Sequence, residues 1–205
     1  MIIANSKPLM IIGYAESSLT QECYNFLSPN FNNNTKIITP EEFISIKNKK
    51  EFQYINAFSL DRPLRKKICD KLDELDLDCV TYIDDTCVVS PSAKIGKGVF
   101  IGPFCTVCLN ANIQNFCSIS TYCLISHYTF IGKNSLLHSA VKIAGKTTVG
   151  KDCVFNFNSS AINDIKITDN VIVGANSNIT KDVVESGYYV GTIARRYYEK
   201  RRSTF

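Results

Sequence analysis

Aliphatic residues recur at every sixth position through the second half of this 205-residue chain. Counting in steps of six from Ile83 to Ile179 gives seventeen positions, and fifteen of them are Ile, Val or Leu. The other two, Phe155 and Ala161, are also apolar. Because the step never changes, no loop is inserted between repeats. A fixed period of six residues indicates a parallel β-helix.

A second column, four places after the first, holds only small or β-branched residues. It runs Cys87, Ala93, Val99, Cys105, Ala111, Cys117, Cys123, Thr129, Ser135, Val141, Thr147, Cys153, Ser159, Ile165, Val171, Ser177 and Val183. Three six-residue units close one coil, so residues one coil apart stack at the spacing of neighbouring strands, about 4.8 Å. We expect the large column to fill the axis of a three-walled prism and the small column to fit where the walls meet.

The residues before Ile83 follow another pattern, in which short apolar runs alternate with amphipathic segments. Strands are predicted over 8–13, 36–39, 52–58 and 79–83. Helices are predicted from Ser17 or Ser18 to Leu27, from Pro40 onward and over 61–75. This alternation predicts a small parallel sheet with crossover helices, a Rossmann-like α/β domain. We therefore divide the chain into an α/β domain (1–82), a β-helix (83–187) and a C-terminal extension (188–205) that ends in a helix.

Composition and charge limit the classes of function. The C-terminal residues from Arg195 carry five basic side chains and one acidic one, which together equal the net charge of +4 of the whole chain. The remainder is therefore close to neutral, which argues against a broad nucleic-acid surface. The basic tail is either a solvated end or a contact for ligand phosphates.

Nine cysteines are present, and five of them fall in the small column, where Cys acts as a compact apolar residue. The others show no paired metal-binding spacing. The longest apolar run near the start, 9–12, is too short to span a membrane, and no secretory signal precedes it. We expect a cytoplasmic protein.

Six segments carry a resemblance to a known family: IIGYAESS (11–18), LRKKI (64–68), SPSAKIGKGVFIGPF (90–104), ISHYTFIG (125–132), IAGKTTVGKDC (143–153) and GTIAR (191–195). These segments are spread over nearly the whole length of the chain, from residue 11 to residue 195. The chain resembles the hexapeptide-repeat sugar acyltransferases of the sialic-acid O-acetyltransferase and nucleotide-amino-sugar N-acetyltransferase type.

The resemblance implies a left-handed β-helix and a homotrimer with active sites between subunits. It also implies acetyl-CoA along the prism wall, with Phe157 and Ala175 at positions that touch it. A UDP- or GDP-linked amino sugar would be held by the N-terminal domain, where Gly13 and Ala15 match a glycine-rich motif. The loop from Gly13 to Ser18 has one glycine and an acidic Glu16, so a purely structural turn is an equal alternative. Phe157 is equally suited to a subunit seam.

His127 falls on the position of the family's catalytic base, although Tyr128 replaces the acidic residue that usually follows it. One coil later the same site holds Gly145, which leaves room for a substrate and exposes backbone N–H groups. An imidazole suits proton transfer from an amine near neutral pH. The alternative is an ordinary surface histidine. His138 lies on another wall, and we expect it to be a corner residue with ordinary solvent contacts.

The leading hypothesis is an acetyl-CoA-dependent N-acetyltransferase that acts on a nucleotide-linked 4-amino-4,6-dideoxy sugar by direct transfer, without a metal. A sugar O-acetyltransferase is the alternative in the same class, and Tyr128 favours an amine acceptor over a hydroxyl. A catalytically idle trimeric scaffold is the third hypothesis. A zinc carbonic anhydrase of this fold would need three histidines at each zinc ion, and the chain has two.

Overall fold

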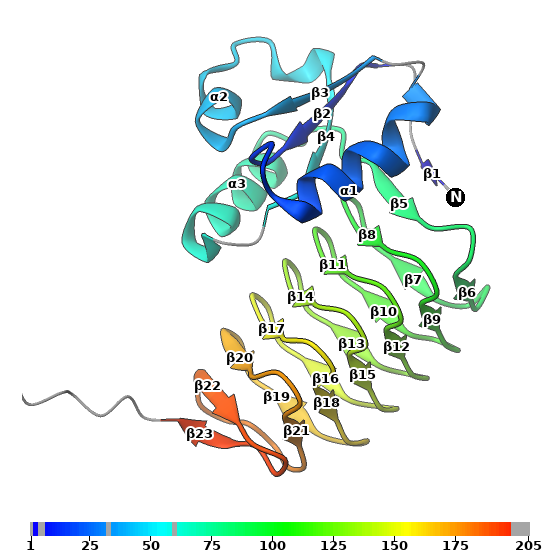
Figure 1. Ribbon diagram of the computed structural model, residues 1–205, viewed down its shortest axis with the longest axis vertical. Coiled ribbons are helices and arrows are strands. Elements are labelled where there is room, and N and C mark those ends of the chain that lie inside the picture. Colours follow the sequence, from blue (N-terminus) through cyan, green and yellow to red (C-terminus); the bar gives the residue numbers. More distant parts are fainter. Residues whose placement is uncertain (1, 4–6, 32–33, 59–60, 198–205) are drawn as a thin grey trace, which may run out of the picture.

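The computed structural model describes residues 2–3, 7–31, 34–58 and 61–197. Figure 1 shows a small α/β unit over one end of a long ladder of short strands. The N-terminal unit holds a three-stranded parallel sheet in the order β3-β2-β4. Its elements are β2 (Leu9–Ile12), α1 (Ser18–Leu27), η1 (Ser28–Phe31), β3 (Thr35–Ile38), α2 (Pro40–Ser45), η2 (Lys49–Glu51), β4 (Gln53–Asn56) and α3 (Arg62–Glu74).

The helices of this unit begin close to the predicted positions. At α2, Thr39 Oγ1 accepts a hydrogen bond from the Glu42 N–H at 3.2 Å, and the Glu42 carboxylate accepts one from the Thr39 N–H at 2.7 Å. This capping box satisfies two backbone donors that the helix itself leaves unpaired. Asp61 Oδ1 caps α3 by accepting from the Leu64 N–H at 2.8 Å. Ser17 is the N-cap residue of α1, but its side chain makes no capping hydrogen bond.

The rest of the chain winds into a parallel β-helix with three walls, which confirms the main prediction from the six-residue period. The first wall holds β5 (Thr81–Ile83), β8 (Phe100–Ile101), β11 (Ser118–Ile119), β14 (Leu136–Leu137), β17 (Val154–Phe155), β20 (Val171–Val173) and β22 (Gly187–Val190), with β1 (Ile2–Ile3) and β23 (Arg195–Tyr197) at its ends. The second wall holds β6 (Val88–Val89), β9 (Thr106–Val107), β12 (Leu124–Ile125), β15 (Lys142–Ile143), β18 (Ser160–Ala161) and β21 (Asn178–Ile179). The third wall holds β7 (Lys94–Ile95), β10 (Asn112–Ile113), β13 (Phe130–Ile131), β16 (Thr148–Val149) and β19 (Lys166–Ile167).

Both predicted columns point into this prism. The large column is buried from Ile101 to Ile179, and the small column from Val99 to Val183. Partners in register lie one coil apart, as Ile119 and Leu137 do. Burial of each Ile or Val side chain contributes about 1.5–3 kcal/mol of gross transfer free energy, so the stacked column is the main source of stability for the prism.

Cys117 tests whether the cysteines of the small column are purely structural. Its side chain is fully buried, and burial raises the pKa of its thiol to about 12. We expect Cys117→Ala to lower the free energy of unfolding by roughly 1–2 kcal/mol, the scale of a small core truncation, and to leave turnover intact. Denaturant unfolding and steady-state assays check this, and a folded variant without activity would contradict it.

One prediction about the start of the prism was wrong. Residues 79–83 do not form a fourth strand of the N-terminal sheet, because β5 pairs with β8 and joins the first wall instead. One bridge, between Tyr54 and Cys79, connects this segment to the N-terminal sheet. In the described part of the C-terminal extension, β22 continues the pairing of the first wall with β20 and forms an antiparallel hairpin with β23. The helix predicted at the end of the extension stays a prediction, because residues 198–205 lie outside the described residues.

Arg65 fastens the N-terminal unit to the prism. Its side chain, 1% exposed, donates through Nη1 to the backbone carbonyls of Asn56 (3.1 Å) and Phe58 (2.7 Å). Through Nη2 it donates to the Phe116 carbonyl (2.8 Å) and to Ser118 Oγ (3.1 Å) in the prism. A single buried guanidinium therefore joins the end of β4 to the first wall.

The longest described α-helix, α3, has 13 residues, and no helix of the described part of the chain could cross a membrane.

Candidate functional site

His127 lies on the corner between the second and third walls, in the turn that joins β12 to β13. Its side chain is exposed, and its ring meets that of Tyr128 edge-on, with 5.7 Å between ring centroids. Within the described residues the imidazole makes no side-chain hydrogen bond. Both ring nitrogens are therefore available to a ligand.

Gly145 lies one coil later on the same corner, directly beside the imidazole. A Cβ atom added at Gly145 would lie 2.5 Å from His127 Cε1 and 2.6 Å from Nε2. The predicted stacking of these two residues is therefore present. The neighbouring Lys146 N–H donates to the His127 carbonyl at 2.8 Å, whereas the Gly145 N–H has no hydrogen-bond partner among the described residues. The corner thus offers an exposed base next to an unpaired backbone donor.

This contact predicts the effect of a methyl group at Gly145. The backbone there has an ordinary φ, so we expect Gly145→Ala to fold normally and to displace the imidazole instead. If His127 acts on the substrate, turnover should fall roughly tenfold to a hundredfold, because small misplacements of a reacting group are costly. Thermal unfolding and turnover would be compared with those of Lys146→Ala, whose side chain is exposed on the same turn. Wild-type turnover in Gly145→Ala would contradict the prediction.

Phe157 and Ala175 lie on a different corner, between the first and second walls. They occupy the same turn position in successive coils, and the Asn176 N–H donates to the Phe157 carbonyl at 2.9 Å. The ring of Phe157 is 57% exposed and stacks on His138, with 5.2 Å between centroids and 28° between planes. The prediction that His138 is a corner residue with ordinary solvent contacts was wrong, because this ring and the approach of α1 half-bury it.

A pocket of about 280 Å³ lies where α1 approaches the first wall, and we call it the α1 pocket. It is lined by Ser18, Leu19 and Glu22 of α1 and by Ser118, Ser120, Leu136, Leu137, His138, Ser139 and Phe157 of the prism. Burial lowers the pKa of His138 and raises that of Glu22. This pocket cannot be predicted from the sequence pattern, because nothing in the six-residue period says where α1 packs.

The loop after β2 leads directly into α1. Gly13 is buried, and a Cβ there would lie 2.2 Å from Thr20 Oγ1 and 3.2 Å from the Ala57 carbonyl oxygen. The close packing of Thr20 and Ala57 is by itself enough to require glycine at this position. Ala15 is exposed, and its carbonyl accepts from Gln21 Nε2 at 2.6 Å. Both residues thus lie near the first turns of α1, whose Ser18, Leu19 and Glu22 line the α1 pocket.

The predicted residues of the prism thus form two clusters on different corners. His127 and Gly145 lie at the far edge of the second wall, while Phe157 and Ala175 lie between the first and second walls. Gly13 and Ala15 belong to the loop before α1. About five residues of extended chain separate the two corners, which corresponds to roughly 16 Å.

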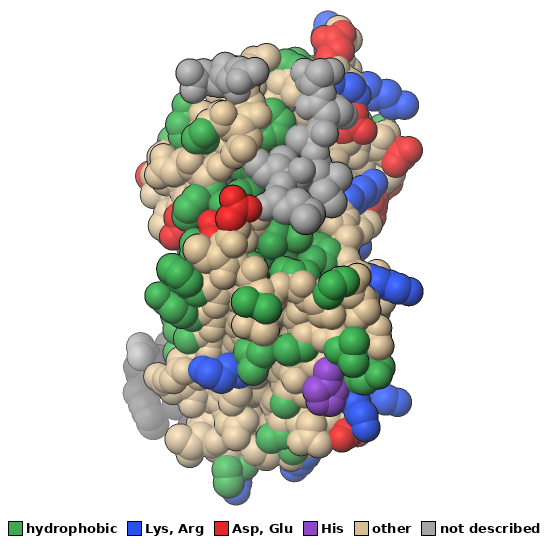
Figure 2. Space-filling model, turned by 90° about the vertical axis from the view of Figure 1, so that its right-hand side faces the viewer, with side chains coloured by type: hydrophobic (Ala, Val, Ile, Leu, Met, Phe, Trp, Pro, Cys, Tyr) green, Lys and Arg blue, Asp and Glu red, His purple; other side chains and the backbone are tan. Residues whose placement is uncertain are grey.

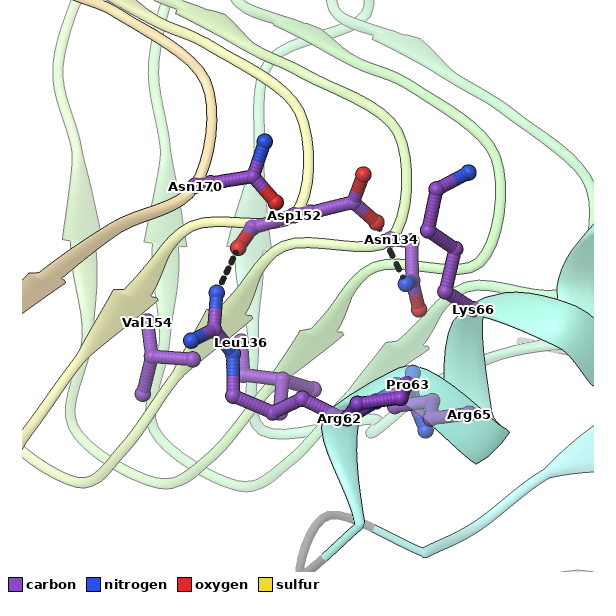
Figure 3. Close-up of a pocket in the computed structure, with 9 residues that line it drawn as sticks. All are labelled: Arg62, Pro63, Arg65, Lys66, Asn134, Leu136, Asp152, Val154 and Asn170. Carbon is purple, nitrogen blue, oxygen red and sulfur yellow. Dashed lines mark hydrogen bonds between the residues drawn. The ribbon is translucent and has the colours of Figure 1, made fainter. Parts of the chain in front are cut away.

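A second pocket, of about 270 Å³, lies under the start of α3 (Figure 3). Arg62 reaches across it, and its Nη2 donates to the Asp152 carbonyl at 2.6 Å. Asn134 Nδ2 donates to the Asp152 carboxylate at 2.7 Å. None of the sequence-predicted site residues lines this pocket. Its polar groups hold the N-terminal unit against the prism.

No cluster of three or more His, Cys, Asp or Glu side chains suited to a metal ion occurs among the described residues.

Comparison with proteins of known structure shows one shared fold over nearly all of the chain. The acetyltransferase domain of PglB from Neisseria gonorrhoeae superposes with a TM-score of 0.82 at 16% identity, over 94% of this chain and 100% of that one. PerB from Caulobacter crescentus, solved with CoA and GDP-perosamine, superposes with a TM-score of 0.80 at 20% identity, over 95% of this chain and 98% of that one. The chain therefore shares the complete architecture of these proteins, including the N-terminal unit.

Sequence comparison reaches a shorter segment, and no family model matches. The chain is 34% identical over 58 residues to the acyl-[acyl-carrier-protein]–UDP-N-acetylglucosamine O-acyltransferases of Brucella ovis and Brucella melitensis. That segment is 28% of this chain, and it spans about a fifth (21%) of the length of those relatives.

Proposed function

We propose that this protein is an acetyl-CoA-dependent N-acetyltransferase whose acceptor is a UDP- or GDP-linked 4-amino-4,6-dideoxy sugar. The observation that carries the proposal is the packing of the exposed His127 imidazole on Gly145, beside an unpaired backbone N–H. The shared architecture supports it, since PerB was solved with CoA and GDP-perosamine and the PglB domain with acetyl coenzyme A.

The reaction requires one proton transfer and one displacement. The acceptor amine attacks the thioester carbonyl, a C–N bond forms, and the nitrogen gives its proton to His127. The carbonyl oxygen gains negative charge in the tetrahedral intermediate, and we assign the Gly145 N–H as the donor that stabilises it. The C–S bond then breaks, and the imidazolium returns the proton to the departing CoA thiolate. A hydroxyl is far less acidic than an ammonium, so removal of its proton would benefit more from a carboxylate beside the base. Tyr128 supplies no carboxylate, which favours an amine as acceptor.

The acetyl donor would lie along the prism. Phe157 and Ala175 are both exposed on the corner between the first and second walls, where their apolar side chains suit contact with the pantetheine arm of acetyl-CoA. Gly13 and Ala15 would hold the nucleotide at the start of α1, within an N-terminal Rossmann-like domain. Under this proposal the domain limits remain 1–82, 83–187 and 188–205, and the coil is left-handed.

A complete site then needs a second copy of the chain, because the two clusters lie on different corners. Exposed apolar side chains mark both edges of the second wall, with Phe104 and Tyr122 on the first corner and Leu109 and Tyr128 on the second. Figure 2 shows apolar side chains spread over one face of the molecule, and the described α-helices all belong to the N-terminal unit. We propose a homotrimer in which one copy supplies His127 and its neighbour supplies the first corner. Light scattering that shows a monomer at micromolar concentration would contradict this arrangement.

The direct test is thiol release from acetyl-CoA with a panel of UDP- and GDP-linked 4-amino-4,6-dideoxy sugars, together with their 4-hydroxy analogues. We expect release that depends on an amino sugar and yields its acetamide by mass spectrometry. Release with the hydroxy analogues alone would identify an O-acetyltransferase. If no acceptor supports release, the chain is an idle scaffold and the proposal fails.

A further inference from the structure

His138 is one of two histidines in the chain, and the reaction outlined above does not use it. Its imidazole is held by the ring of Phe157 on one side, and it lines the α1 pocket together with the first turns of α1. A half-buried histidine in a pocket of about 280 Å³ is a candidate ligand contact, because it presents polar nitrogens where water is partly excluded.

The position of the α1 pocket links the two proposed ligands. Ser18 of the lining directly follows the loop that contains Gly13 and Ala15, and Phe157 of the lining belongs to the proposed acetyl-CoA contact. An acceptor whose nucleotide lies at the loop and whose amine meets the thioester must place its sugar ring between them. The α1 pocket is lined from both sides, by α1 and by the prism, and is therefore the candidate place for that ring.

The chemistry of the lining also suits a deoxy sugar. Ser120 and Ser139 offer hydroxyl groups, and Ser118 accepts a hydrogen bond from Arg65, so that its own O–H remains free to donate. Leu19 and Leu136 suit an apolar carbon such as the methyl group of a 6-deoxy ring. Glu22, the acidic residue of this lining, disfavours a phosphate group here.

We propose that the α1 pocket binds the sugar ring of the acceptor and that His138 hydrogen-bonds a ring hydroxyl there, which makes it a specificity-determining residue. This inference rests on the proposed function. Burial lowers the pKa of the His138 imidazole and so favours its neutral form, in which one nitrogen donates a hydrogen bond and the other accepts one. His138 recognises the substrate, while His127 moves the proton.

Calorimetric titration without acetyl-CoA separates the sugar from the nucleotide. The ligands are UDP- and GDP-linked 4-amino-4,6-dideoxyhexoses, and free UDP and GDP. We expect His138→Ala to weaken binding of the nucleotide sugar about tenfold and to change binding of the free nucleotide less than twofold, since one hydrogen bond is lost. His138→Gln, which keeps a donor and an acceptor, should stay within about threefold of wild type.

Two further variants complete the test. Ser120→Ala removes another hydroxyl from the same pocket and should weaken the nucleotide sugar severalfold, even if His138→Ala does not fold. Asn156→Ala is the matched control: Asn156 holds the position of His138 one coil later, and its Nδ2 donates to the Val173 carbonyl instead of facing the α1 pocket. It should bind both ligands as wild type does.

The outcomes distinguish this inference from the proposed function. Equal weakening of sugar-linked and free nucleotide, or unchanged binding in His138→Ala and Ser120→Ala, overturns the sugar subsite while leaving the proposed function standing. Wild-type protein that binds none of the ligands overturns both.

Discussion

Replacement of His127 by alanine is expected to lower turnover by about 10²–10⁴ and to leave the fold and the affinity for acetyl-CoA unchanged. The magnitude is that of a positioned general base, and the imidazole is exposed and supports no part of the core. The residual rate should rise with pH, because a larger fraction of the acceptor amine is then already deprotonated. Stopped-assay turnover between pH 6 and 9, on protein whose assembly has been checked by light scattering, measures both effects.

The control for this experiment is Asn163→Ala. Asn163 is exposed on the same corner one coil beyond Gly145, and its Nδ2 bonds locally to Asp164 at 2.8 Å. Asn163→Ala should retain full turnover.

His138→Ala should mainly raise the KM for the acceptor, with little change in kcat. If instead kcat falls further in His138→Ala than in His127→Ala, the base lies on the first corner and the assignment of His127 is wrong.

Replacement of Arg65 by methionine is expected to lower the free energy of unfolding by about 3–5 kcal/mol, the largest stability effect that we predict. Four acceptors on both sides of the junction would lose their partner, and unpaired buried polar groups are costly. The guanidinium is itself imperfectly satisfied, because its Nε–H has no hydrogen-bond partner among the residues that the structure describes. Methionine keeps most of the volume, so the loss reports mainly on hydrogen bonding.

Urea unfolding monitored by circular dichroism provides the measurement, with Arg62→Met as the control. Arg62 also reaches the prism, but through one hydrogen bond to Asp152, so its loss should cost about 1 kcal/mol. We further expect Arg65→Met to separate unfolding into two transitions, with the N-terminal unit unfolding first. A single transition at the wild-type midpoint would show that Arg65 does not hold the two parts together.

Local patterns in the sequence were sufficient for the prism and for one candidate cluster. In a coil of fixed length, residues one turn apart must stack, so the contact between His127 and Gly145 follows from their spacing. The inward columns and the capped starts of α2 and α3 are likewise decided by neighbours in the chain or by a constant period. These features needed no knowledge of how distant parts pack.

The tertiary structure alone decided the rest. The sequence pattern predicts His138 as a surface residue, whereas in the structure it lines the α1 pocket. The reason is that α1, more than a hundred residues earlier in the sequence, packs against the first wall. Arg65 of α3 also joins the N-terminal unit to the prism, through a hydrogen bond to Phe116, 51 residues later in the chain, that follows no period. Residues 81–83 join the first wall because the edge of β8 is free to pair with another strand. At the other end of the wall, the edge of β20 pairs in the same way with β22, the first strand of the C-terminal hairpin. Repeats encode their own stacking, whereas the docking of a separate unit on a repeat depends on long-range contacts that no local pattern contains.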